Sequence, residues 1–171
     1  AGSYSVTYTN GSGCSATSTA TTVTVNALPT APTVSASGST TFCAGGSVTL
    51  TSSQATGNLW STGATTQSIV VSAAGSYSVT YTNGNGCSAT SSATTVTVNA
   101  LPTAPTVSAS GSTTFCAGGS VTLTSSQATG NLWSTGATTQ SIVVSAAGSY
   151  SVTYTNGSGC SATSTATTVT V

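Results

Sequence analysis

The sequence predicts an all-β protein built from tandem copies of one small domain. Three observations support this: the chain of 171 residues repeats itself with a period of 73, apolar and polar residues alternate at a period of two, and glycine-rich turns separate the alternating segments. No segment of useful length places apolar residues at helical spacing.

The repeat is nearly perfect. The run AGSYSVTYTNG begins at Ala1, Ala74 and Ala147, and residues 27–73 are identical to residues 100–146. Copies of the remaining stretch vary at two positions only, where the first and third copies agree: Ser12, Asn85 and Ser158, and Thr19, Ser92 and Thr165. This pattern fits either a two-domain unit or a recent duplication.

All four prolines lie in the sequence NALPTAP, which occurs at residues 26–32 and 99–105. Paired prolines favour an extended, semi-rigid joint, so the domain boundaries are placed there. We expect residues 1–26 to be the C-terminal strands, F and G, of an incomplete repeat whose earlier part precedes Ala1. Residues 27–99 and 100–171 are then complete repeats.

Within residues 27–99, alternation predicts the strands in chain order. Each segment places its apolar side chains on one face and its hydroxyls on the other. The segments are SVTLTSS (47–53), QSIVVSA (67–73), GSYSVTYTN (75–83) and TTVTVN (94–99), and Trp60 lies on the presumed third strand. The turn sequences CAGGS, ATGN, STGA, SAAG and NGNG separate them. About seven short strands per repeat, each with one apolar face, require two packed layers, and an immunoglobulin-like β-sandwich meets this requirement.

The composition excludes most chemistry. The chain contains no Asp, Glu, Lys, Arg or His, whereas general acid–base catalysis normally uses His, Glu, Asp or Lys, and hydroxyl nucleophiles need an adjacent base. Nucleic-acid binding relies on Lys and Arg, and Ca²⁺ and Mg²⁺ sites rely on carboxylates. We therefore expect no enzyme, no nucleic-acid partner, and no catalytic, cofactor-binding or metal-binding residue.

An uncharged surface also favours association, because no electrostatic repulsion keeps copies apart. Folding should respond little to salt or to pH near neutrality. The sequence contains neither an apolar run of the roughly 20 residues that a membrane-spanning helix needs nor a visible signal peptide.

The five cysteines fall into two classes. Cys43 and Cys116 precede the second strand of a repeat, and Cys14, Cys87 and Cys160 follow an Asn-Gly turn. Pairing Cys43 with Cys87 and Cys116 with Cys160 closes two equal loops of 44 residues, each stabilising by about 3.5–4 kcal/mol. We predict this pairing, one disulfide per domain, with Cys14 unpaired within the chain.

Disulfides indicate an extracellular or cell-surface location. The alternative is five free thiols; zinc binding would require clustered CxxC pairs, which are absent.

The runs LPTAPTVSASGSTTFCAGGSVTLTSS and NLWSTGATTQSIVVSAAGSYSVTYTNGNGC carry a family likeness. They resemble the immunoglobulin-like repeats of giant secreted surface proteins of Bacteroidetes-type bacteria. The resemblance implies export by the type IX route and a role as an adhesin or cell-surface fibre. It covers every residue of the chain.

Aromatic residues fit the core of such a sandwich. Gly75-Ser-Tyr77 resembles the tyrosine corner of immunoglobulin domains, and Trp60 resembles their core Trp. We assign Trp60, Tyr77, Trp133 and Tyr150 to the core; the alternative is a stacking platform for sugars. Asn10-Gly-Ser12 and Asn156-Gly-Ser158 match the glycosylation sequon but are more simply hairpin turns.

These features predict a structural repeat of an extracellular filament or cell-surface stalk that associates with copies of itself. Strand exchange between chains, with residues 1–26 completing a sandwich elsewhere, stays open. The alternative function is a tandem adhesion module that binds carbohydrate or ice through hydroxyl arrays such as Thr94, Thr95 and Thr97.

Overall fold

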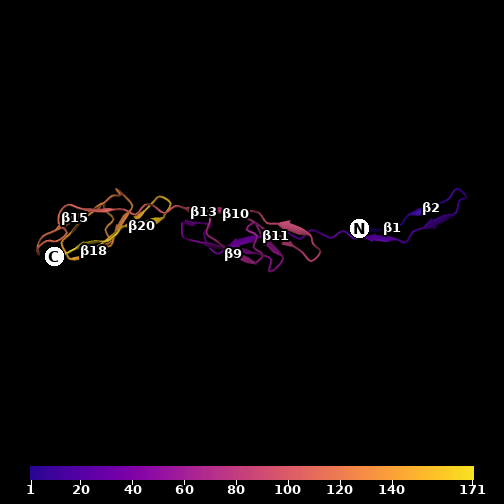
Figure 1. Cartoon of the computed structure of the whole chain (residues 1–171), viewed down its shortest axis with the longest axis horizontal. Coiled ribbons are helices and arrows are strands. Elements are labelled where there is room, and N and C mark those ends of the chain that lie inside the picture. Colours follow the sequence, from indigo (N-terminus) through magenta and orange to yellow (C-terminus); the bar gives the residue numbers. More distant parts are fainter. The chain divides into compact units, whose positions relative to one another are not determined.

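The computed structural model describes all 171 residues, and every regular element in it is a β-strand (Figure 1). The chain divides into two compact units that interleave along the sequence. Unit 1 comprises Ala1–Ser37, Thr49–Ile69 and Ser76–Thr94, and unit 2 comprises Gly38–Val48, Val70–Gly75 and Thr95–Val171. These units do not follow the 73-residue period, so the domain limits at residues 27 and 100 stay a prediction.

Residues 100–171 lie wholly in unit 2 and show the fold of one repeat. They contain β14 (Val107–Ala109), β15 (Val121–Ser125), β16 (Asn131–Trp133), β17 (Ser141–Val144), β18 (Gly148–Tyr150), β19 (Val152–Thr155), β20 (Ser161–Thr163) and β21 (Thr167–Val169).

Two three-stranded antiparallel sheets and one two-stranded antiparallel sheet make up this repeat. One sheet has the order β14-β15-β17 and the other has the order β16-β19-β20, while β18 pairs with β21. Period-two alternation turns the apolar side chains of both sheets toward one core. The buried core residues come from both layers: Val121, Leu123, Trp133, Ile142, Val144, Val152 and Val169.

A buried serine breaks the last two long strands into pairs of short ones. Ser164 follows β20, and its hydroxyl accepts the Val152 N–H at 3.1 Å, while its own N–H donates to the Val152 carbonyl at 2.9 Å. A side-chain oxygen thus takes the place of a ladder carbonyl, and the β18–β19 and β20–β21 segments are each interrupted there. Ser91 makes the same pair of bonds with Val79.

Residues 27–99 follow the same plan. Their strands are β5 (Val34–Ala36), β6 (Thr41–Cys43), β7 (Val48–Ser52), β8 (Asn58–Trp60), β9 (Ser68–Val71), β10 (Gly75–Tyr77), β11 (Val79–Thr82), β12 (Ser88–Thr90) and β13 (Thr94–Asn99). In unit 1, β5 pairs with β7, and β11 lies between β8 and β12. In unit 2, β6 runs parallel to β13.

Residues 1–26 form a hairpin of four short strands: β1 (Gly2–Tyr4), β2 (Thr7–Thr9), β3 (Ser15–Thr17) and β4 (Thr21–Val23). β1 pairs with β4 and β2 with β3. The hairpin has no second layer of its own, so Val6 is 69 % exposed, whereas the equivalent Val79 and Val152 are 0 % exposed.

The predicted all-β class is confirmed, and the packing of antiparallel sheets around one core in residues 100–171 agrees with the predicted β-sandwich. The strands in each repeat are more numerous than the predicted seven because the serine interruptions divide the last two strands. The helix-free structure also contains no helix long and apolar enough to cross a membrane.

Candidate functional site

The Asn-Gly turn holds the cysteine that follows it. Asn156 accepts the N–H groups of Ser158 and Cys160 on its side-chain Oδ1, both at 3.0 Å. Gly159 lies at φ +78°, a conformation that only glycine adopts without strain, and its N–H donates to the Asn156 carbonyl. Asn10 caps the turn at Cys14 in the same way. These bonds confirm the hairpin-turn interpretation of both Asn-Gly-Ser sequences.

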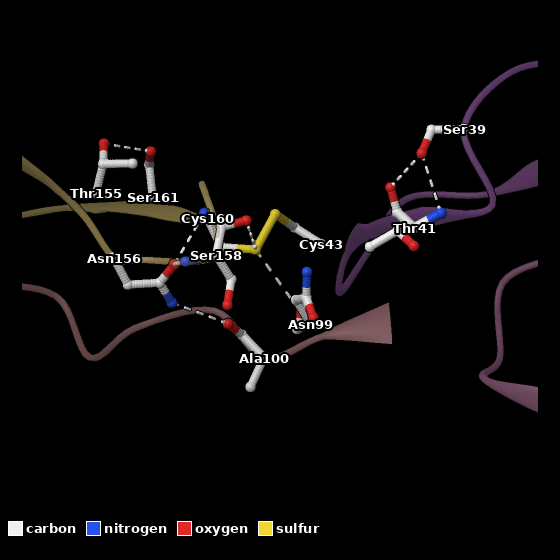
Figure 2. Close-up of a disulfide and its surroundings, with 10 residues drawn as sticks. All are labelled: Ser39, Thr41, Cys43, Asn99, Ala100, Thr155, Asn156, Ser158, Cys160 and Ser161. Carbon is white, nitrogen blue, oxygen red and sulfur yellow. Dashed lines mark hydrogen bonds between the residues drawn. A yellow bond between two sulfur atoms is a disulfide. The ribbon is translucent and has the colours of Figure 1, made fainter. Parts of the chain in front are cut away.

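The turn at Cys160 lies against the linker through which the chain enters its repeat. The Asn156 side-chain amide donates to the Ala100 carbonyl at 3.4 Å, and the Cys160 sulfur lies 3.9 Å from the Asn99 carbonyl oxygen (Figure 2). Cys87 occupies the equivalent place in unit 1: its sulfur lies 3.9 Å from the Asn26 carbonyl oxygen, and Asn83 donates to Ala27. Cys87 and Cys160 therefore mark the N-terminal end of a repeat.

The other cysteine class lies where the chain leaves its repeat. In the parallel pairing of β6 with β13, Cys43 is opposite Asn99, and the neighbouring Ala44 N–H donates to the Asn99 carbonyl at 2.8 Å. Cys116 follows the equivalent segment, in which Thr114 forms a parallel bridge with Thr170. Cys43 and Cys116 therefore mark the C-terminal end of a repeat.

A disulfide joins Cys43 to Cys160 across this joint, within unit 2 (Figure 2). Their Cα atoms are 5.6 Å apart, a separation that a disulfide spans without backbone movement. Asn99 brings the two cysteines together, because its backbone faces Cys43 in the strand pair and its carbonyl adjoins the Cys160 sulfur. The bond links one sequence repeat to the next and encloses a separation of 117 residues.

The predicted pairing of Cys43 with Cys87 and of Cys116 with Cys160 is wrong in this structure. Cys14, Cys87 and Cys116 are free thiols. The physical reason is position: the two cysteines of one repeat lie at its opposite ends, one beside the linker that enters and one beside the strand that leaves. The equal spacing of the two cysteines within each repeat predicted a bond between them, but the fold places these two cysteines at opposite ends of the repeat.

The aromatic residues assigned to the core lie as follows. Trp60 and Trp133 are 2 % exposed, and their indole N–H groups donate to the carbonyls of Thr66 and Thr139 at 2.9 Å. Tyr150 packs against the core of residues 100–171, and its hydroxyl donates to the Ala146 carbonyl at 2.9 Å. Tyr77 is half-buried.

Paired hydroxyls cover the outer surface of the β19–β20 hairpin. Thr153 bonds to Thr163 and Thr155 to Ser161, each at 2.8 Å between hydroxyl oxygens. The same pairs recur between β11 and β12 and between β2 and β3. Of the Thr residues considered for ligand binding, Thr95 and Thr97 are exposed and Thr94 is half-buried.

The structure contains no pocket and no cluster of His, Cys, Asp or Glu side chains that could hold a metal ion.

No protein-family profile matches the chain. No curated protein sequence matches it either.

Three solved structures are similar in part. The fibronectin(III)-like modules of Clostridium thermocellum CbhA match at 15 % identity over 80 % of this chain and 91 % of theirs, with a TM-score of 0.36. The human OSCAR ligand-binding domain matches at 14 % identity over 84 % and 100 %, with a TM-score of 0.35. Bacteroides ovatus SGBP-B, solved in complex with a mixed-linkage heptasaccharide, matches at 19 % identity over 100 % and 54 %, with a TM-score of 0.24. None of these likenesses says what this chain binds.

Proposed function

We propose that residues 27–99 and 100–171 are structural repeats of an extracellular filament or cell-surface stalk. The observation that carries the proposal is the Cys43–Cys160 disulfide, which joins one repeat to the next. A bond placed at the joint resists separation of neighbouring repeats, which is a mechanical role. A disulfide also requires an oxidising compartment, and this supports an extracellular location.

The surface chemistry supports assembly with copies of the same chain. The chain carries no charged side chain, so copies approach without electrostatic repulsion. Proteins usually protect exposed sheet edges with Lys, Pro or bulges, and this sequence has no Lys to place there. We therefore include homotypic association into a filament in the proposal.

Catalysis is not part of the proposed role. Without His, Asp, Glu or Lys, the chain has none of the usual proton-transfer groups, and its many hydroxyls have no base beside them. The resemblance to repeats of secreted Bacteroidetes-type surface proteins favours the same function. Export by the type IX route rests on that resemblance alone.

Electron microscopy of the native material at neutral pH tests the proposal. The filament account expects fibres wider than one domain, with an axial period of one or two sandwiches of about 35 Å each if strands run near the axis at about 3.3 Å per residue. Single particles with no periodic assembly at any concentration would contradict it. Single chains seen as flexible rows of separate domains would support the stalk and exclude the multi-chain filament.

The paired hydroxyl rows favour a second candidate, a tandem adhesion module for carbohydrate or ice. Regular rows of Thr hydroxyl and methyl groups on β11–β12 and β19–β20 supply an uncharged, repeating surface. Because these hydroxyls already bond to one another, a ligand must compete with those bonds. A glycan array tests sugar binding, and an ice-recrystallisation assay with the whole chain tests ice binding.

A further inference from the structure

The two three-stranded sheets of residues 100–171 end in the edge strands β14, β17, β16 and β20. Three of these edges are poorly suited to pairing with a further strand. β14 follows the two prolines of NALPTAP, and proline commonly protects a sheet edge. In β16, a tight turn occupies Trp133, whose N–H donates to the Ala137 carbonyl and whose carbonyl accepts the Gly136 N–H, both at 2.8 Å. β20 is the short run SAT, which has no large apolar side chain.

The fourth edge, β17, is open. The Ser125 N–H on β15 donates to the Gln140 carbonyl at 2.9 Å, and backbone groups point to alternate sides along an antiparallel strand. Every second residue of β17 therefore bonds to β15, and the residues between them, Ser141 and Val143, point their N–H and C=O groups away from the sheet.

Val143 has the most accessible groups on this edge. The Ser141 carbonyl accepts the Thr139 hydroxyl at 2.6 Å, whereas the outward N–H and C=O of Val143 have no partner within the chain. The side chains of Ile142 and Val144 are buried, and the Val143 side chain is 70 % exposed on the outer face of the sheet. One residue thus offers a backbone donor, a backbone acceptor and an apolar side chain.

The same edge occurs in residues 27–99. β9 is the last strand of the sheet β5-β7-β9, and Val70, also 70 % exposed, takes the place of Val143. The sequence QSIVVS is identical at residues 67–72 and 140–145. It combines β-branched residues with no charge, no proline and no glycine, which is the composition typical of segments that pair between chains.

We propose that β17 pairs antiparallel with β17 of a second copy of this protein, about a two-fold axis at Val143. The Val143 N–H of each copy then donates to the Val143 carbonyl of the other. Such a pairing uses the free donor and the free acceptor of the same residue at once, which is why the edge fits its own copy. No charged side chain opposes the approach.

This pairing also covers the exposed valine. Facing residues of this kind lie about 5.5 Å apart between Cα atoms, so the two Val143 side chains contact one another on the same face. Each three-stranded sheet continues into the other, and the two together form one sheet of six strands. β9 offers the equivalent contact through Val70.

The first test compares two double variants that carry the same added charge. V70K/V143K places lysines opposite one another in the proposed pair, and like charges at facing positions oppose pairing. L59K/L132K is the matched control: Leu59 and Leu132 are 53 % exposed, but their backbone groups bond to β11 and β19. Light scattering over a range of protein concentrations measures association.

The wild-type chain should associate with rising concentration, and V70K/V143K should associate about tenfold or more weakly. L59K/L132K should associate like the wild type. A wild-type chain that stays monomeric at every concentration, or equal association of the two double variants, would overturn the proposal.

Amide exchange of the wild-type chain, followed by NMR, is the second test and needs no variant. The Val143 and Val70 amides should exchange rapidly in dilute protein and slow down as the concentration rises. The Ala109 amide on β14 is the control: it also points outward, since the neighbouring Ser110 N–H donates to Thr122 on β15. Slowing at Ala109 without slowing at Val143 would place the contact on the other edge and overturn the proposal.

This inference deepens the proposed filament and rests on it, and the two fail separately. If electron microscopy finds the same fibres in the wild type and in V70K/V143K, the β17 pairing is wrong and the filament proposal stands. If the Val143 amide slows with concentration and V70K/V143K abolishes association, but microscopy finds no fibres, the β17 pairing stands and the filament proposal is wrong.

Discussion

Cys43 and Cys160 belong to successive copies of the same repeat, and their Cα atoms lie 5.6 Å apart. Asn99 lies beside both residues, as the strand partner of Cys43 and as the nearest carbonyl to the Cys160 sulfur. The last residue of one predicted domain therefore organises its covalent attachment to the next. Variants at the joint, in the core and in the turns can separate the contribution of this bond from the packing and turn chemistry of the repeats themselves.

Loss of the joint disulfide should destabilise the chain. The bond encloses a long segment, so C160S is expected to lower the free energy of unfolding by about 2–4 kcal/mol. Urea titration followed by Trp fluorescence measures this change. C87S is the matched control, since Cys87 occupies the same turn without a bond, and its effect should stay within about 0.5 kcal/mol. Equal losses in the two variants would contradict the assigned pairing.

Burial at one repeat position should decide the cost of truncation. Val152 is 0 % exposed and Val6, at the equivalent position of the hairpin, is 69 % exposed. Val152→Ala is expected to cost about 2 kcal/mol or more through lost packing and a cavity, whereas Val6→Ala should cost less than about 0.5 kcal/mol. Thermal unfolding of the two variants provides the comparison. A large effect of Val6→Ala would mean that the hairpin buries this face in solution.

The serine that interrupts the last strands should matter only where it is buried. Ser164 accepts the Val152 N–H inside the sandwich, and Ser18 accepts the Val6 N–H in the exposed hairpin, both at 3.1 Å. Ser164→Ala leaves a buried donor unpaired and should cost about 1–3 kcal/mol. Ser18→Ala leaves the Val6 N–H to bond with water, so this variant should change the free energy of unfolding very little. Denaturant unfolding measures the loss of unfolding free energy in each variant. Equal losses would show that water reaches the Val152 N–H.

Two glycines with similar backbone geometry should respond differently to alanine. Gly130 and Gly136 lie at φ +74° and +86°. A Cβ at Gly130 would lie 2.7 Å from the Thr155 carbonyl oxygen, whereas nothing lies within 4 Å at Gly136. Gly136→Ala should show the conformational cost alone, about 1 kcal/mol. Gly130→Ala should cost clearly more, because backbone atoms must move. Similar melting temperatures for both variants would show that the turn at Gly130 adjusts freely.

Stability should be nearly independent of pH and salt. With no Asp, Glu, His, Lys or Arg side chain, the folded and unfolded states bind the same number of side-chain protons between about pH 4 and pH 7, so the linkage slope is zero. Chemical denaturation of thiol-alkylated protein across that range, at low and high NaCl, checks this. A change of more than about 1 kcal/mol in either direction would contradict it.

Alternation at period two was enough to predict the core strands, because a half-buried strand must turn every second side chain inward. Leu50, Val79 and Val96 follow that rule and are buried. The disulfide could not be predicted the same way. Its geometry depends on the parallel pairing of β6 with β13, which brings Cys43 to Asn99, and no local pattern encodes a parallel contact between distant segments. The serine interruptions were missed as well, since Ser164 differs from a surface serine only by its burial.

Disulfide mapping of the native chain tests the central claim most directly. Digestion after Phe, Tyr, Trp and Leu releases Cys87 in fragment 82–115 and Cys160 in fragment 155–171, which differ in mass, and releases both Cys43 and Cys116 in the peptide CAGGSVTL. We predict fragment 155–171 joined to CAGGSVTL, with the same bond retained in C116S. Loss of that bond in C116S, or fragment 82–115 joined to CAGGSVTL in the monomer, would show that each repeat closes on itself and would contradict the joint.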